Sequence, residues 1–176
     1  IALISDAGTP LISDPGYRLV SALRDEGIEV VPVPGPSALI AALSVAGLPT
    51  DRFVFEGFLP AKRKARRDRM EQLGAESRTI VFYESRHRIV ECLQDMALVF
   101  GDRRLAVVAR ELTKLHEQIV RASLKELLEW IDSDEHHQKG EFVIMVHGES
   151  TISSPELDES AQKTLAVLVR ELPLKQ

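Results

Sequence analysis

The sequence predicts an α/β fold organised in two domains. Short apolar runs that stop at a carboxylate, glycine or proline alternate along the 176 residues with segments of helical length. In the first 48 residues the order is strand, helix, strand, helix, which implies parallel strands joined by right-handed crossovers. The residue pattern of the sequence changes around Gly47–Thr50, and we place a domain boundary there. With 44% hydrophobic residues, the chain can build a real core.

The elements of the first half are short and alternate strictly. Strands are predicted at residues 1–5 and 28–33, and helices at residues 17–26 and 38–46, the second with Ser37 as its N-cap. The first strand begins at residue 1, and a central strand rarely starts a complete domain. We therefore expect the sequence to be a fragment.

The second half continues the alternation. Strands are predicted at residues 52–58, 79–83, 104–110, 118–121 and 142–147. Helices are predicted at residues 61–75, from a Ser85 cap to Phe100 before Gly101, and from the capping box Ser123–Glu126 through Ile131. The pattern then indicates a polar linker at residues 148–156 and a helix at residues 157–172.

The composition of the chain argues against several classes of protein. The chain has no apolar run of the ~20 residues that a membrane span needs, and its N-terminus carries no basic-then-apolar signal peptide. We therefore expect no membrane partner. The single cysteine, Cys92, lies in an apolar helical pattern, which indicates a buried structural thiol and a cytoplasmic protein. A net charge of −5 does not suggest global attraction to nucleic acid, but the charge is unevenly distributed.

Two loops at predicted strand ends are candidate ligand contacts. In the loop 6–10, the Asp6 carboxylate can accept hydrogen bonds and Gly8 permits close approach of a ligand to the backbone. In the loop 34–38, a strand end meets a helix N-terminus, whose free N–H groups suit a carboxylate or phosphate. The loops lie one strand apart and can converge on one cleft. An ordinary turn and a rigid proline-rich connection remain the alternatives.

The predicted helix 61–75 carries a dense cluster of basic residues that would make a positive surface suited to phosphates. At 3.6 residues per turn the charges surround the helix, so we expect no face of it to be buried. Arg78, Arg86 and Arg88 could extend this surface, and a solvated charged helix is the alternative. The cluster consists of Lys62, Arg63, Lys64, Arg66, Arg67 and Arg69.

Catalytic chemistry is less clearly marked. Glu84 and Glu111 follow predicted strands and could be general bases or salt-bridge partners. The five histidines lack metal-ligand spacing, so we expect no metal, and no Ser, His and Asp pair for nucleophilic catalysis. The absence of a Walker loop and of G-x-G-x-x-G argues against a standard nucleotide-hydrolysing or nicotinamide-dependent enzyme.

The chain resembles the tetrapyrrole methylase superfamily, and within it the enzymes that methylate small-subunit ribosomal RNA. The resemblance rests on six strings that run in order from Ile1 to Gly148: ISDAGTPLISDPGYRLV, VPVPGPSALIAALSVAGLP, FEGFLPAKRKARR, IVFYESRHRI, VARELTKLHEQIV and KGEFVIMVHG. It implies a homodimer of two-domain α/β subunits that hold S-adenosylmethionine (SAM) between the domains. The implied reaction transfers the SAM methyl group to a cytidine ribose 2′-hydroxyl of the 16S rRNA, with the 30S subunit as partner.

The resemblance also implies the domain limits and the site. Residues 1–48 would be the C-terminal half of the SAM-binding domain, 49–148 the second domain, and 149–176 a linker and the start of a helical extension. The implied SAM-binding positions of the first domain are Asp6, Ala7, Gly8, Thr9, Pro10, Gly35, Pro36, Ser37 and Ala38. Those of the second domain are Phe82, Tyr83, Leu112, Thr113 and Phe142. The basic cluster 62–69 is assigned to rRNA phosphates.

Two departures from the superfamily affect these expectations. Its members begin with a strand and a P-I-G-N-type glycine loop, which this sequence lacks, and their C-terminal helical extension is cut off after Gln176. We therefore expect this chain alone to bind SAM weakly or not at all. Glu84 is the candidate base for the 2′-hydroxyl, since we expect it at a strand end facing the cleft. A salt bridge to Arg86 or Arg88 is its alternative role.

Two other functions stay open. One is a methyltransferase for a tetrapyrrole or another small acceptor, against which the basic helix argues because a porphyrinoid needs an apolar trough. The other is a non-catalytic fragment that dimerises and binds RNA. The SAM interpretation requires that Gly8 and Ser37 share one hollow with Leu112 and Phe142.

Overall fold

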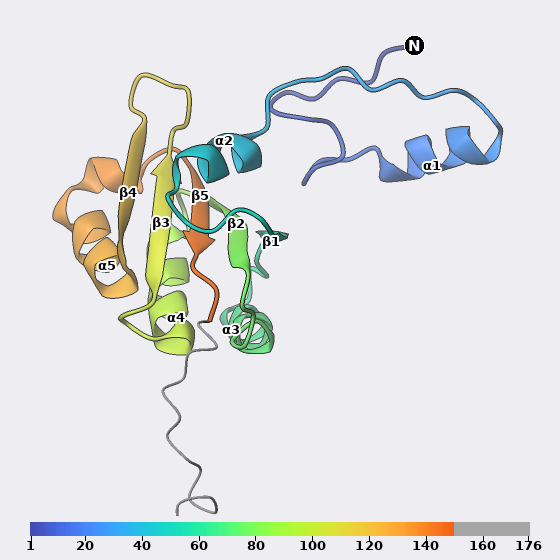
Figure 1. Ribbon diagram of the computed structural model, residues 1–176. Helices are drawn as coiled ribbons and strands as arrows, with labels where there is room; N and C mark the ends of the chain where they lie inside the picture. The colour runs from blue at the N-terminus through green and yellow to red at the C-terminus, as the bar shows by residue number, and fades with distance from the viewer. Residues whose placement is uncertain (150–176) are drawn as a thin grey trace, which may run out of the picture.

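The computed structural model describes residues 1–149, and its body is a five-stranded mixed sheet (Figure 1). The strands lie in the order β1-β2-β5-β3-β4. Their bounds are β1 Phe53–Phe58, β2 Thr79–Ser85, β3 Leu105–Arg110, β4 Gln118–Ser123 and β5 Glu141–Val146. The helices are α1 Tyr17–Asp25, α2 Ala38–Val45, α3 Arg63–Gln72, α4 Ile89–Phe100, α5 Leu124–Ser133 and the 3₁₀ helix η1 Glu135–Gln138.

The five strands predicted for the second half are confirmed, and their pairing places the last strand in the middle. β1 and β2 are parallel, whereas β5 runs antiparallel between β2 and β3, and β4 pairs antiparallel with β3. This arrangement brings the C-terminal ends of β1, β2 and β3 to the same edge of the sheet as the N-terminal end of β5. That edge carries the candidate site described below.

Each face of the sheet is covered by its own apolar cluster. Helices α3, α4 and α5 cover one face, where Phe82, Met96 and Leu127 belong to the larger cluster. Helix α2 covers the other face with Leu39 and Leu43, which pack with strand residues of a smaller cluster (Figure 1). Because side chains alternate along a strand, neighbouring residues of β2 belong to different clusters.

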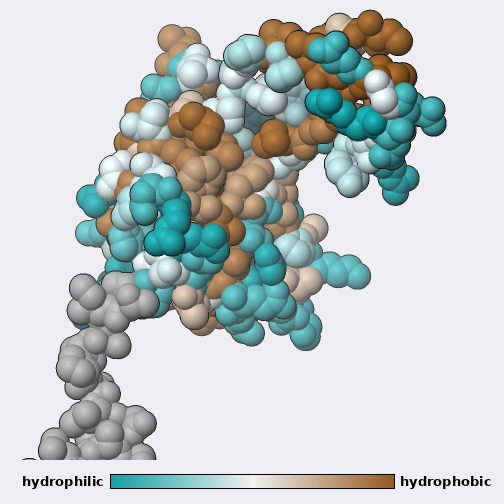
Figure 2. Space-filling view, turned by 45° about the vertical axis from the view of Figure 1, so that its right-hand side comes forward, coloured by the Kyte–Doolittle hydropathy of each residue, from teal (hydrophilic) through white to brown (hydrophobic). Residues whose placement is uncertain are grey.

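The two strands predicted at residues 1–5 and 28–33 are wrong. Both segments lie outside regular secondary structure, on an arm with α1 at its end (Figure 1). A β-strand exists only where a neighbour completes its hydrogen bonds, and no strand within residues 1–149 lies beside either segment. Their apolar side chains, including Ile4 and Val33, are exposed, and Figure 2 shows hydrophobic residues gathered on this arm.

The helices predicted within residues 1–149 exist, but the start of one was misplaced. Helix α4 begins at Ile89 rather than after a Ser85 cap, because Ser85 is the last residue of β2 and pairs there with Glu141. The capping box of α5 and the end of α4 at Gly101, with φ of 92°, are confirmed. Ser37 occupies the N-cap position of α2 but makes no side-chain capping bond to that helix. The helix predicted at residues 157–172 lies outside the described residues.

Candidate functional site

A cavity of about 690 Å³ opens at the edge of the sheet where β1, β2 and β3 end and β5 begins. Its volume is in the range of small-molecule sites. Its walls come from parts of the chain far apart in sequence. Gly8 and Ser37 line it from the first half, and Leu112 and Phe142 line it from the second. The four residues that the SAM interpretation requires in one hollow therefore share one.

The two loops of the first half contact each other at the cavity. The Thr9 hydroxyl donates a 2.8 Å hydrogen bond to the carbonyl oxygen of Pro36. Gly8 lies beside the same carbonyl, which a Cβ at Gly8 would meet at 4.0 Å. The convergence of these loops was predicted from their place at neighbouring strand ends, yet it occurs without the strands themselves.

Tyr83 joins the sheet to the first turn of α2. Its hydroxyl accepts a 3.1 Å hydrogen bond from the N–H of Leu39, one of the donors that a helix start leaves without an internal partner. Its ring packs edge-on against Phe55 and Phe58, with centroids 4.9 and 5.7 Å away. Burial raises the pKa of Tyr83, although hydrogen bonds with Leu39 and Ser37 act in the opposite direction. The hydroxyl therefore stays protonated and bridges the two halves of the cavity wall.

The turn after β3 is held in an uncommon backbone conformation. Glu111 and Thr113 have φ of 51° and 64°, in the left-handed region that residues other than glycine rarely adopt. The Glu111 carboxylate accepts hydrogen bonds from Lys114 Nζ and from the N–H of Glu141, both at 2.9 Å. These contacts lower the pKa of Glu111, the bond from Lys114 most. They also fix Leu112 against the cavity.

Gly140 makes room for this arrangement. A Cβ at Gly140 would lie 2.5 Å from side-chain atoms of Glu111, and its φ of 103° also disfavours any other residue. Glu111 was considered in the sequence as a base or a salt-bridge partner, whereas Gly140 was not predicted as part of the site. The strand-end turn after β3 was recognised in the sequence, but Gly140 directly precedes β5, whose place beside β3 no local pattern indicates.

The implied SAM positions divide into those that line the cavity and those that do not. Lining it are Ala7, Gly8, Thr9, Ser37, Ala38, Tyr83, Leu112 and Phe142. Outside the lining are Asp6, Pro10, Gly35, Pro36, Phe82 and Thr113. The Phe82 side chain lies in the larger core cluster on the opposite face of the sheet. The other residues that line the cavity include Phe58 and His87, which were not proposed as ligand contacts, and Arg86, which was expected only as an extension of the positive surface.

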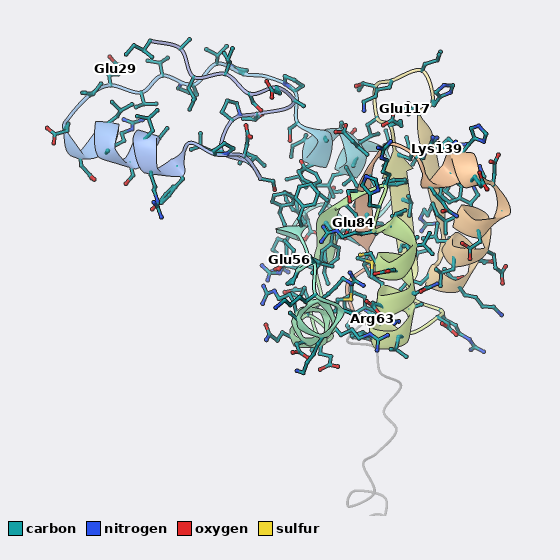
Figure 3. All side chains as sticks on the ribbon, turned by 180° about the vertical axis from the view of Figure 1, so that it is seen from behind. Glu29, Glu56, Arg63, Glu84, Glu117 and Lys139 are labelled. Carbon is teal, nitrogen blue, oxygen red and sulfur yellow. The ribbon has the colours of Figure 1, made fainter. Side chains whose placement is uncertain are left out.

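Glu84 borders the cavity, but its side chain has no exposed surface (Figure 3). Its Oε1 accepts hydrogen bonds from Arg88 Nε at 2.9 Å and from the N–H of Ser85 at 2.7 Å. This geometry corrects the expectation that the carboxylate faces the cleft. The alternative, an ion pair with Arg88, is the role that the structure has. Glu84 lies two residues after Phe82 on β2, so its side chain points to the same face of the sheet as that of Phe82, into the core.

The basic helix α3 is also different from the expectation. The carboxylate of Asp95 on α4 accepts hydrogen bonds from Arg63, which is labelled in Figure 3, and from Arg66 and Arg67, with distances of 3.1, 2.7 and 2.6 Å. Arg66 is completely buried, so the prediction that no face of the helix is buried is wrong there. Burial alone would raise the pKa of Asp95, but the bonds from Arg67, Arg66 and Arg63 hold it below its ordinary value.

The other basic residues at and around α3 make ion pairs that are more exposed to solvent or, in the described part of the chain, make none. Arg69 makes a two-pronged ion pair with Glu56, with both distances 2.9 Å (Figure 3). Lys64 pairs with Asp68 at 2.8 Å on the exposed side of the helix. Lys62, at the N-cap position, is exposed and has no ion pair within residues 1–149. The positive surface that α3 offers to a phosphate is therefore concentrated at its N-terminal end.

No helix within residues 1–149 has both the length and the apolar character that a membrane crossing requires. In the same residues, no three His, Cys, Asp or Glu side chains gather as metal ligands.

The family described as Tetrapyrrole (Corrin/Porphyrin) Methylases matches residues 1–128 of the chain. Ribosomal RNA small subunit methyltransferase I of *Vibrio cholerae* is 56% identical over 175 residues, which are 99% of this chain and 61% of that protein. The protein of the same name from *Xylella fastidiosa* (strain Temecula1) is 57% identical over 173 residues, 98% of this chain and 63% of that protein. The chain thus spans less than two thirds of the length of these relatives.

Solved structures with the same fold are more distant in sequence. The methyltransferase CobJ superposes with a TM-score of 0.57 at 21% identity, over 80% of this chain and 62% of that chain. Uroporphyrin-III C-methyl transferase from *Thermus thermophilus*, complexed with S-adenosyl homocysteine, superposes with a TM-score of 0.51 at 22% identity, over 81% and 63% of the two chains. At these identities the likeness concerns the fold.

Proposed function

The chain belongs to the family of tetrapyrrole (corrin/porphyrin) methylases, and we propose that it supplies the donor cavity of a SAM-dependent methyltransferase for small-subunit rRNA. The acceptor in this proposal is a cytidine ribose 2′-hydroxyl. The single observation that carries it is the shared cavity, in which loops 6–10 and 34–38 meet the turn after β3 and the start of β5. The names of the relatives at 56% and 57% identity supply the substrate class.

The residues around the cavity fit SAM. Leu112, Ala109 and Val143, which belong to the apolar cluster on the α2 side of the sheet, offer apolar atoms to the adenosine and the methionine chain. Phe142 borders the cavity, but its side chain is buried in the larger cluster. The first turn of α2 and the loop at Gly8 offer backbone polar groups to the carboxylate and the ribose. When bound, SAM would supply the electrophilic methyl group. Uroporphyrin-III C-methyl transferase, which shares the fold, carries S-adenosyl homocysteine, the demethylated form of this donor.

The chain's own contribution to the reaction is positioning. A 2′-hydroxyl attacks a methyl group only when oxygen, carbon and sulfur lie in line, and holding that geometry supplies much of the acceleration. Tyr83 and Glu111 fix the two walls that would set it, through Leu39 and through Lys114. Glu84 is unsuited to the role of base, because its carboxylate is buried against Arg88.

We further propose the domain division given by the resemblance: residues 1–48 as half of the SAM-binding domain, 49–148 as the second domain, and 149–176 as the start of an extension. Supporting it, α1 has no buried residue and the apolar side chains of the arm are exposed, as in a part that packs against more protein. A cytoplasmic homodimer that acts on the 30S subunit completes the proposal. At the start of α3, the exposed Lys62 and Lys64 are the residues we assign to rRNA phosphates, since Asp95 already binds Arg63.

A tetrapyrrole acceptor is less well supported. The relatives named as rRNA methyltransferases are 56% and 57% identical to this chain, whereas the uroporphyrin enzyme is 22% identical. At the lower identity a fold is shared but a substrate need not be.

The test is transfer of labelled methyl groups. The complete two-domain protein would be incubated with 30S subunits and methyl-labelled SAM, and the rRNA would be digested to nucleosides. We expect the label in 2′-O-methylcytidine. Label in a different nucleoside, or transfer to uroporphyrinogen III with none to rRNA, would overturn the proposal.

A further inference from the structure

We propose that Phe58, Arg86 and His87 form the rim that binds the acceptor nucleotide, with a base of the rRNA on the Phe58 ring and a phosphate on the Arg86 guanidinium. This inference rests on the proposed rRNA methyltransferase function. All three residues line the same cavity as Leu112 and Gly8, so a nucleotide held by them would lie beside the donor site. Arg86 was expected only as an extension of the positive surface of the basic helix, and Phe58 and His87 were not assigned to RNA.

The arginines around the sheet differ in whether a carboxylate already binds their guanidinium. Arg63, Arg66 and Arg67 share the Asp95 carboxylate, and Arg88 holds Glu84. Arg78 bonds Glu76 at 2.7 Å. Arg86, in contrast, has no carboxylate partner within residues 1–149 and is exposed. It is therefore the cavity-lining arginine whose guanidinium is available to a phosphate, a group that arginine binds with two parallel hydrogen bonds.

The turn that carries Arg86 and His87 is held by hydrogen bonds at both ends. The N–H of Arg88 donates to the carbonyl of Ser85 at 3.1 Å, which closes the turn. The Arg88 side chain anchors it from below by bonding Glu84 and, at 3.1 Å, the carbonyl of Leu59. A turn tied at both ends presents its two central side chains in a fixed direction, which lowers the entropy cost of binding.

The side chains of Arg86 and Phe58 are each held by a neighbouring side chain. Arg86 Nε donates to His87 Nε2 at 3.2 Å, so His87 orients the guanidinium and leaves its terminal nitrogens free. Phe58 is the last residue of β1 and is 51% exposed, although its ring packs edge-on against Tyr83. An aromatic face that is half exposed and fixed from behind is a stacking platform for a base, because every base has a π-face.

A rival role for Arg86 is binding the carboxylate of SAM. The experiment therefore measures both substrates of the complete two-domain protein: the KM for 30S subunits in methyl transfer, and the Kd for SAM by calorimetry. The variants are Phe58→Ala, Arg86→Ala and Arg86→Lys. The matched controls are Leu98→Ala, an exposed apolar residue on α4, and Arg103→Ala, an exposed arginine, both outside the cavity lining.

We expect Phe58→Ala and Arg86→Ala each to raise the KM for 30S subunits roughly tenfold, with an unchanged Kd for SAM. Arg86→Ala should also reduce by about one the slope of log affinity against log salt in rRNA-fragment binding. Arg86→Lys should restore part of the affinity, and both controls should match the wild type. An unchanged KM, or a loss of SAM affinity equal to the loss for rRNA, would overturn the inference.

Failure of the proposed function looks different. If the proposed function is wrong, the wild-type protein itself methylates no rRNA. If only the rim inference is wrong, the wild type is active and the rim variants have the same KM for 30S subunits as the wild type. If the wild type is inactive, gel shifts with rRNA fragments still decide the matter, since equal binding by the wild type and by both alanine variants would remove the rim.

Discussion

The hydroxyl of Tyr83 and the N–H of Leu39, 44 residues apart in the chain, are joined by a 3.1 Å hydrogen bond. The bond ties the end of β2 to the first turn of α2, and with it the two halves of the cavity wall. It uses a helix-start N–H that has no partner inside the helix. This side-chain oxygen therefore helps to hold α2, and the cavity wall that α2 carries, against the sheet.

Tyr83→Phe removes this oxygen and keeps the ring contacts with Phe55 and Phe58. We expect the free energy of unfolding to fall by about 1 kcal/mol, since a partly buried N–H loses its acceptor. Urea denaturation of this chain measures the loss. Tyr17→Phe is the matched control, because Tyr17 is 73% exposed and should tolerate the change. Equal stability of the two variants would show that the hydroxyl does not hold α2.

Asp95→Asn tests the cluster beneath α3. The substitution leaves the guanidinium of the completely buried Arg66 without its closest carboxylate. Breaking a buried ion pair typically costs about 3–5 kcal/mol, and we expect a loss of that size in urea denaturation. Asp68→Asn serves as the control, since its pair with Lys64 is exposed and should contribute little. A loss no greater than that of the control would mean that Asp95 does not organise α3 and α4.

Much of the second half of the fold follows from local sequence. The capping box at Ser123, the glycine that ends α4 and the five apolar strand segments are each specified within a few residues. The pairing of the strands is not specified by local sequence. The segments 1–5 and 28–33 have the apolar composition of strands, but a strand requires a neighbour, which residues 1–149 do not provide.

Some features of the site could likewise be predicted from local sequence, and others could not. The loops near Gly8 and Ser37 were predictable because strand ends and helix starts carry ligands so often. The buried roles of Glu84 and Arg66 were also within reach of the sequence. Glu84 shares its parity on β2 with Phe82, and Arg66 lies four residues before the buried Met70 on one helical stripe. The contact of Glu111 with Gly140 was not within reach, because it depends on β5 lying beside β3.

Acid should destabilise the chain through carboxylates that arginines hold ionised. The hydrogen bond from Arg78 lowers the pKa of Glu76 from 4.5 to about 2, and that of Asp95 is also below its ordinary value. A carboxylate whose pKa is lower in the folded state contributes fully above its unfolded pKa and loses that contribution as the pH falls. We expect the free energy of unfolding to fall between pH 4.5 and about 2.

The substitution Glu76→Gln isolates one of these groups. The variant should be less stable than the wild type at pH 6, and the difference should shrink at pH 3, where the wild type is losing the same interaction. Urea denaturation at both pH values measures it. Glu129→Gln on the exposed surface of α5 is the control. A difference that stays constant with pH would contradict a role for Glu76 in the acid response.

Gly140→Ala tests the packing of the turn after β3. The new Cβ would meet Glu111 at 2.5 Å, and this side chain cannot move freely because Lys114 and the Glu141 N–H hold its carboxylate. The positive φ adds about 1–3 kcal/mol. Gly101→Ala has a similar φ of 92° with nothing within 4 Å, so it carries the backbone cost alone. We expect Gly140→Ala to be the more destabilising of the two in urea.

A double substitution separates the contact from the backbone. In a Glu111→Ala background the Cβ that Gly140→Ala introduces no longer meets the glutamate side chain. The loss in free energy of unfolding caused by Gly140→Ala should then fall to that caused by Gly101→Ala. In the complete two-domain protein, Gly140→Ala should also weaken SAM binding, since Leu112 belongs to the same turn. Equal costs of Gly140→Ala with and without Glu111 would show that the two residues are not coupled.

SAM binding by this chain alone should be far weaker than by the complete two-domain protein. The wall that carries Gly8 belongs to an arm whose helix α1 has no buried residue, and one hydrogen bond from Thr9 to Pro36 joins its two loops. A ligand must then order that wall, which reduces the observed affinity. Calorimetry should detect no micromolar binding to the 176-residue chain and clear binding to the complete protein. Micromolar binding to the chain alone would mean that the cavity between loops 6–10 and 34–38, Tyr83 and Leu112 is already in its binding conformation.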